Sequence, residues 1–213
     1  DAGTPEVTVP VRDDTASKRS LSSEIMLDVR GLSVSFGGLQ AVADVSFQVH
    51  KGEVLGIIGP NGAGKTTLFN LLNGFIPASA GEIIFANTNL VGLKPNQVCR
   101  LGVGRTFQVA RPFSRLSVLE NVIVGAFAKD ADDETARKHA LEALGRVGML
   151  GHAEVLAGSL NSLELRLMEL ARVLAGRPDL LLMDETLAGL GADEVEIMLS
   201  TLNHLADQGQ SIV

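Results

Sequence analysis

Residues 59–66 read Gly59-Pro60-Asn61-Gly62-Ala63-Gly64-Lys65-Thr66, which is a complete G-x-x-x-x-G-K-[ST] phosphate-binding loop. The apolar stretch before it, residues 53–58, is typical of a short buried strand. The stretch after it, residues 66–73, has a helical pattern, and Gly74 is placed to end that helix. The loop therefore lies between a predicted strand and a predicted helix, which is the context that phosphate binding requires.

The chemistry of such a loop comes mainly from its backbone. Successive N–H groups at a helix N-terminus point toward a bound anion, and the glycines let the backbone approach phosphate oxygens closely. Lys65 would reach the β- and γ-phosphates, and the Thr66 hydroxyl would bind Mg²⁺. The alternative is a chance match, which should arise in on the order of one chain in a hundred. We therefore predict that the whole loop, together with Thr67, binds a nucleotide.

Length and composition are those of an α/β protein. The chain has 213 residues, of which 46% are hydrophobic and 20% are charged, enough for one substantial core or a core with a small subdomain. A net charge of −7 argues against a protein that binds nucleic acid through bulk positive charge. The single cysteine, Cys99, excludes an intrachain disulfide. No apolar run approaches the roughly 18–20 residues that a membrane-spanning helix needs.

The local composition and the spacing of apolar residues change along the chain. Residues 1–24 are rich in Asp, Thr, Ser and Pro and lack periodicity, so we interpret them as a flexible tail or linker. Further along the chain, alternating or continuous apolar patterns predict strands near residues 32–36, 45–49, 81–85 and 180–183. Helical patterns follow Ser117 and cover residues 132–147, 162–175 and 193–206. Residues 210–213 look like the first half of a strand, so we expect a longer native polypeptide.

Two acidic residues close the apolar strand predicted at residues 180–183. An acid at the carboxyl end of a buried strand, beside a phosphate loop, is placed to organise Mg²⁺, and we assign this role to Asp184. Glu185, one residue further, is placed to orient and deprotonate an attacking water. The alternative is an ordinary strand end that leads into a polar turn. The phosphate loop upstream favours the functional interpretation.

With these motifs the chain resembles the ATP-binding subunits of ABC transporters, from about residue 26 to residue 213. The resemblance implies an α/β fold in which a P-loop NTPase (RecA-like) core carries an antiparallel β subdomain and an inserted α-helical subdomain. On this basis residues 25–108 and 164–213 form the nucleotide-binding core, and residues 109–163 form the helical subdomain. The implied cofactors are ATP and Mg²⁺.

Two further residues receive roles from the resemblance alone. Phe36 stands 29 residues before Lys65, where the family has an aromatic side chain that stacks on adenine. Periodicity by itself makes Phe36 equally a core residue of a strand. Gln108 matches the glutamine loop of the family, which contributes to the Mg²⁺ site and links it to the subdomain that contacts the membrane partner.

Four stretches make the chain similar to one branch of the family, the branched-chain amino-acid importer ATPases. Lipopolysaccharide-export ATPases are near relatives that typically differ in the run before the glutamine. The four stretches are residues 36–42, 66–70, 105–108 and 185–190.

The family signature, usually Leu-Ser-Gly-Gly-Gln, aligns with Leu160-Asn161-Ser162-Leu163-Glu164. In the family this segment contacts the γ-phosphate held by the opposite subunit, and we assign that role to Asn161 and Ser162, whose hydroxyl would replace the missing one. Both glycines are absent, and Leu163 adds a side chain where the backbone should approach phosphate. The spacing of Asn161 and Glu164 also fits a helix cap, which is the structural alternative.

The resemblance implies a Mg²⁺-dependent ATPase subunit, with Glu185, Gln108 and Lys65 as catalytic residues. Two subunits, identical or different, would enclose two nucleotides and drive a membrane permease from the cytoplasmic face of the membrane, for the uptake of branched-chain amino acids. Because the signature is altered and a longer polypeptide is expected, we expect this chain to be weakly active or inactive. The alternatives are a soluble ABC ATPase without a permease and a regulatory subunit whose composite site is degenerate.

Overall fold

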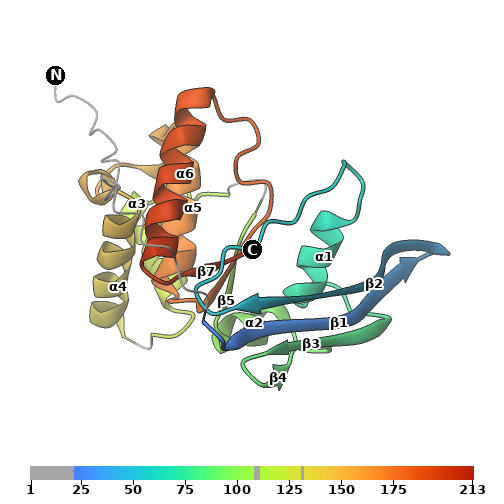
Figure 1. Cartoon of the computed structure of the whole chain (residues 1–213). Helices are drawn as coiled ribbons and strands as arrows, with labels where there is room; N and C mark the ends of the chain where they lie inside the picture. The colour runs from blue at the N-terminus through green and yellow to red at the C-terminus, as the bar shows by residue number, and fades with distance from the viewer. Residues whose placement is uncertain (1–21, 108–110, 131) are drawn as a thin grey trace. The chain divides into compact units, whose positions relative to one another are not determined.

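The computed structural model describes residues 22–107, 111–130 and 132–213 (Figure 1). These residues form two compact units. The sheet unit contains residues 22–105, 179–184 and 209–213, and the helical unit contains the described parts of residues 106–178 and 185–208. Most of the predicted tail lies outside the described residues, and so does Gln108.

The sheet unit contains a four-stranded antiparallel sheet with the strand order β2-β1-β3-β4. The longest pairing joins the first two strands in a hairpin, whose last pair is Phe36 with Leu39. This sheet confirms the antiparallel strands predicted from alternating apolar residues. The strands are β1 (Ile25–Phe36), β2 (Leu39–His50), β3 (Ala80–Phe85) and β4 (Thr88–Asn89).

The core of the sheet unit lies between this sheet and helix α1 (Lys65–Leu72). Leu27 and Val29 of β1 are 1% exposed and belong to one apolar cluster with Leu68 and Leu72 of the helix. Full burial of each such side chain contributes roughly 1.5–3 kcal/mol. The helix that begins at the phosphate loop is therefore held in place by its apolar face.

A second sheet of the sheet unit has the order β5-β6-β7, and its last two strands are parallel. Strand β6 is buried along most of its length, as expected for a parallel strand with an unbroken apolar sequence. The strands predicted at residues 180–183 and 210–213 are thus confirmed. The strands are β5 (Val103–Thr106), β6 (Leu180–Met183) and β7 (Ser211–Ile212).

The prediction of a buried strand at residues 53–58 is wrong. These residues form a single bridge, between Val54 and Ile212, and Ile58 is 97% exposed. Pairing is limited to the first part of the run, where Ile212 N donates to Glu53 O at 2.9 Å and Leu55 N donates to Ile212 O at 2.8 Å, and no described strand pairs with residues 56–58. An apolar run becomes a strand only where its backbone groups find such partners.

Helix α2 (Pro95–Leu101) was not predicted, although its ends carry recognisable residues. Pro95 occupies the first helical position, where a missing N–H costs nothing. Gly102 follows the helix in a left-handed conformation, with a φ of 113°.

The helical unit confirms the helices predicted after residue 116. Glu120 N donates to Ser117 Oγ at 3.2 Å, and Ser117 N donates to the Glu120 carboxylate at 2.7 Å, which is the predicted capping box. The hydrogen bond from the Ser117 backbone lowers the pKa of Glu120. The main helices, drawn in Figure 1, are α3 (Val118–Ala126), α4 (Asp133–Arg146), α5 (Ser162–Ala175) and α6 (Ala192–Asp207), with short 3₁₀ helices η1 (Leu150–His152) and η2 (Ala157–Ser159).

Helices α3 and α5 of the helical unit touch through their backbones. A Cβ atom added to Gly125 in α3 would lie 1.8 Å from the carbonyl oxygen of Arg172 in α5. No side chain could be accommodated there unless the two helices moved apart. Gly145 in α4 differs, since a Cβ atom there would make an ordinary contact of 3.4 Å with Leu150.

We expect Gly125→Ala to lower the free energy of unfolding by at least about 2 kcal/mol, because the added methyl group separates α3 from α5. The matched control, Gly145→Ala, should be neutral or should stabilise the protein by up to about 1 kcal/mol, because alanine favours the helix. Urea unfolding followed by circular dichroism measures both variants. Equal effects of the two substitutions would contradict the close packing at Gly125.

Candidate functional site

The phosphate loop is shaped by glycines and lies against strand β2. Gly62 and Gly64 have φ values of 82° and 85°, in the left-handed region that glycine adopts without strain. A Cβ atom on Gly64 would lie 2.3 Å from the carbonyl oxygen of Ala41 in β2, so the two backbones are in direct contact. Gly64 is also the N-cap of α1, whose first turn carries no acidic residue. The N-terminal dipole of α1 is thus not offset by a carboxylate of its own first turn.

The side chain of Lys65 folds back onto its own loop. Its Nζ donates hydrogen bonds to the carbonyl oxygens of Gly59, at 2.7 Å, and Pro60, at 2.9 Å. The ammonium group is therefore held against the first two carbonyl groups of the loop. This is the position from which a lysine would meet the β- and γ-phosphates of a nucleotide.

The two residues predicted to hold Mg²⁺ from the sequence motifs are brought together. The hydroxyl of Thr66 and Oδ1 of Asp184 are 3.4 Å apart, although 118 residues separate them in sequence. Asp184 is 3% exposed. A hydroxyl and a carboxylate are oxygen ligands of the kind that Mg²⁺ prefers, with water and phosphate oxygens completing its shell. Among the described residues, no group of three or more His, Cys, Asp and Glu side chains offers a separate metal site.

Arg105 also contacts Asp184, and sequence reasoning did not assign it to the site. Its Nη2 donates to Oδ2 of Asp184 at 3.1 Å, and the side chains of both residues are 4% exposed. Burial lowers the pKa of Arg105, and the neighbouring carboxylate opposes that shift. A signal was present, because an arginine in the short buried strand β5 requires a polar partner.

Phe36 is not a core residue of strand β1. Its side chain is 49% exposed at the end of the β1–β2 hairpin. Ala41, which touches Gly64, lies two residues beyond the hairpin partner Leu39. The ring is therefore on the surface and close in sequence to a segment that contacts the phosphate loop, which favours the predicted role in stacking over the core interpretation.

Glu185 directly follows the buried Asp184 and is itself exposed. Its φ of 49° is in the left-handed region, which costs a residue with a Cβ atom on the order of 1 kcal/mol. Strain of this kind is concentrated at functional positions. The assignment of Glu185 to catalysis stays a prediction, and Gln108 lies outside the described residues.

The signature segment forms the start of helix α5 in the helical unit. Asn161 Oδ1 accepts from Glu164 N at 2.9 Å, and the Glu164 carboxylate accepts from Asn161 N at 2.8 Å, so the predicted helix cap is present. Ser162 is exposed, whereas Leu163 is only 6% exposed. The Leu163 side chain is thus turned away from the surface that presents Ser162. The nucleotide-binding role of Asn161 and Ser162 stays a prediction.

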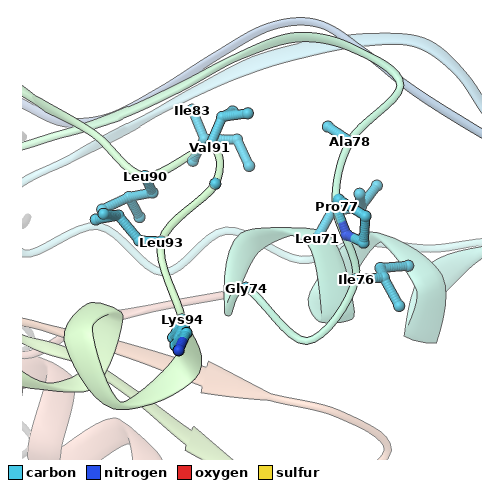
Figure 2. A pocket seen from close by; sticks show the side chains of 11 residues that line it. Leu71, Gly74, Ile76, Pro77, Ala78, Ile83, Leu90, Val91, Leu93 and Lys94 are labelled. Carbon is cyan, nitrogen blue, oxygen red and sulfur yellow. The ribbon is translucent and has the colours of Figure 1, made fainter.

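A cavity of about 170 Å³ occurs elsewhere in the sheet unit (Figure 2). Its lining is mostly apolar and includes Leu71, Ile83 and Leu90, with Lys94 at one end. None of the predicted site residues lines this cavity. The candidate site is therefore defined by the phosphate loop and the carboxyl end of β6.

Comparison with known proteins also indicates a nucleotide-binding protein. The family model for ABC transporters matches residues 42–188. The high-affinity branched-chain amino acid transport ATP-binding protein LivG of Escherichia coli K12 is 38% identical over 201 residues, covering 85% of this chain and 79% of LivG. The lipopolysaccharide export system ATP-binding protein LptB of the same organism is 34% identical over 188 residues, covering 88% of this chain and 78% of LptB.

A solved structure agrees in fold as well as in sequence. The ADP conformation of MJ1267, an ATP-binding cassette of an ABC transporter, has a TM-score of 0.82 and 28% identity, covering 89% of this chain and 80% of MJ1267. The predicted fold class, a P-loop NTPase with an antiparallel sheet and a helical subdomain, is thereby confirmed. The chain belongs to the ABC transporter family as an ABC ATPase subunit homologous to the ATP-binding proteins of branched-chain amino-acid transporters.

Proposed function

We propose that this chain hydrolyses ATP in a Mg²⁺-dependent reaction and thereby drives branched-chain amino-acid uptake through a membrane permease. One observation carries the proposal. The Thr66 hydroxyl and the Asp184 carboxylate are 3.4 Å apart at the N-terminus of the helix that follows the phosphate loop. The substrate class is supported by the 38% identity to LivG, whose name describes branched-chain amino-acid transport.

The phosphates would be bound mainly by the loop itself. Backbone N–H groups of residues 61–67 would donate to phosphate oxygens, and Lys65 would place its positive charge beside the β- and γ-phosphates. Thr66 and Asp184 would hold Mg²⁺, which supplies charge neutralisation at the phosphate oxygens. Thr66 and Asp184 already lie 3.4 Å apart without nucleotide, so these two side chains would need little reorganisation at the time of reaction.

Two residues complete the proposed chemistry. Glu185 would orient the attacking water and accept its proton, since it follows Asp184 at the carboxyl end of β6. Gln108 would contribute to the metal site and would connect it to the helical segment at residues 109–163. We propose this functional division of the chain: a nucleotide-binding core at residues 25–108 and 164–213, and a helical subdomain at residues 109–163.

The proposed assembly pairs two ATPase subunits with the permease. Asn161 and Ser162 would face the nucleotide of the second subunit, and the absence of both signature glycines would make that contact weaker than usual. The assembly would lie on the cytoplasmic face of the membrane. Among the described residues, no helix is both long and apolar enough to cross a bilayer.

A specific observation supports one alternative function, that of a regulatory subunit. A regulatory subunit with a degenerate composite site would explain why Ser162 and Leu163 replace the glycines. A soluble ABC ATPase without a permease is not favoured, because the relatives LivG and LptB are named as transport and export proteins. Turnover by the assembled pair of ATPase subunits therefore distinguishes the proposal from its alternative.

We expect Phe36→Ala to weaken the binding of ATP and of other purine nucleotides to a similar degree, by about 1–3 kcal/mol, because stacking recognises the face of a base. Equilibrium titration with fluorescent nucleotide analogues measures the change. Thermal unfolding without nucleotide should be nearly unaffected, since the ring is half exposed. A large loss of stability with unchanged affinity would assign Phe36 to packing instead.

In the assembled transporter, Glu185→Gln should reduce steady-state phosphate release at least tenfold, because an amide cannot accept the proton of the attacking water. Release by the parent chain should stop when EDTA removes Mg²⁺, and its rate should be modest because the signature is altered. In cells that carry the permease, the same variant should abolish uptake of labelled leucine. Glu196→Gln, an exposed change on α6, is the control. Turnover unaffected by Glu185→Gln would overturn the catalytic assignment.

A further inference from the structure

We infer that Arg105 is a positioning residue that acts as a permanent countercharge to Asp184, holding the carboxylate in place without metal and moderating its affinity for Mg²⁺. The part of this inference that concerns Mg²⁺ rests on the proposed function. The part that concerns the Arg105–Asp184 pair rests on the geometry of the sheet unit alone.

The two oxygens of Asp184 have different neighbours. Oδ1 lies 3.4 Å from the Thr66 hydroxyl, on the side of the phosphate loop. Oδ2 accepts from Nη2 of Arg105 at 3.1 Å. Arg105 therefore fixes the carboxylate from one side and leaves the oxygen beside Thr66 to bind a metal.

The guanidinium group is itself held on several sides. Its Nη1 donates to Oδ1 of Asn70 at 2.7 Å. Its central carbon lies 5.8 Å from the ring centre of Phe69 and 5.9 Å from that of Phe75, within the range of cation–π attraction. A group with these contacts and 4% exposure cannot swing away when another cation arrives. Arg105 thus remains beside Asp184 whether or not a metal ion is bound.

Asn70 ties this cation to the helix that bears Thr66. Residues 66 and 70 are four positions apart in α1 and share one face of the helix. The Thr66 hydroxyl and the Asn70 amide thus contact Asp184 and Arg105 respectively. The two proposed metal-binding side chains are connected through Arg105 and Asn70 as well as directly.

The energetic consequence follows from the burial of both charges. A carboxylate that is nearly excluded from water is strongly destabilised unless an opposite charge and hydrogen bonds compensate it. Arg105 provides that compensation when no metal is present. Because the arginine stays in place, its positive charge also repels an incoming divalent cation, so Mg²⁺ should bind Asp184 less tightly than it would bind an uncompensated carboxylate.

A double-mutant cycle tests the countercharge. Arg105→Met should lower the melting temperature of the nucleotide-free protein by at least about 6 °C, because Asp184 is left buried without its partner. Adding Asp184→Asn should recover at least half of that loss, since the uncompensated charge is removed. The exposed pair Arg137 and Glu154, changed to Met and Gln, is the control and should show small, additive effects. Additive losses at Arg105 and Asp184 would overturn the inference.

Mn²⁺ binding in the presence of saturating ADP, followed by electron paramagnetic resonance, tests the effect on the metal. Arg105→Met should bind Mn²⁺ at least about threefold more tightly than the parent, and Arg105→Lys, which keeps the charge, should stay close to the parent. Unchanged or weaker binding by Arg105→Met would overturn this part. If the parent bound no Mn²⁺, the proposed metal site would be wrong. The double-mutant cycle on thermal stability would still test the interaction between Arg105 and Asp184.

Discussion

The buried carboxylate of Asp184 is the group on which the site depends. It lies at the end of β6, it approaches the Thr66 hydroxyl at the start of α1, and it accepts a hydrogen bond from Arg105 of β5. A negative charge with 3% exposure is stable only where such partners are fixed around it. Three elements that are distant in sequence must therefore keep their relative positions, and this requirement links the fold to the chemistry.

The surrounding sheet unit supplies that rigidity through backbone contact and apolar packing. Gly64 touches the Ala41 carbonyl, which positions the phosphate loop against β2 at a distance that no other residue type allows. The buried face of α1 anchors the helix to the antiparallel sheet. The phosphate loop and the start of α1 are consequently held in place by the sheet unit itself, and donors on such a rigid support would stabilise developing negative charge most effectively.

Local signals in the sequence were sufficient for much of this architecture, whereas contacts between distant segments were not. The phosphate loop, the Ser117 cap and the acid after β6 could be predicted because each depends on neighbouring residues. The strand expected at residues 53–58 failed because its pairing depends on β7, more than 150 residues away. Arg105 was missed for the same reason, since its partner Asp184 lies 79 residues further along the chain. The role of Gln108 came from family resemblance, not from its local sequence.

The most direct measurement is isothermal titration of ATP, without metal, into the parent chain and into Lys65→Ala. The ammonium group donates to the Gly59 and Pro60 carbonyls, so its removal eliminates a support of the loop together with the proposed phosphate contact. We predict at least a tenfold weaker affinity, about 1.4 kcal/mol. Lys51→Ala, a change at an exposed lysine, should leave the affinity unchanged. Equal affinities of the parent and Lys65→Ala would contradict the assignment of this loop as the nucleotide site.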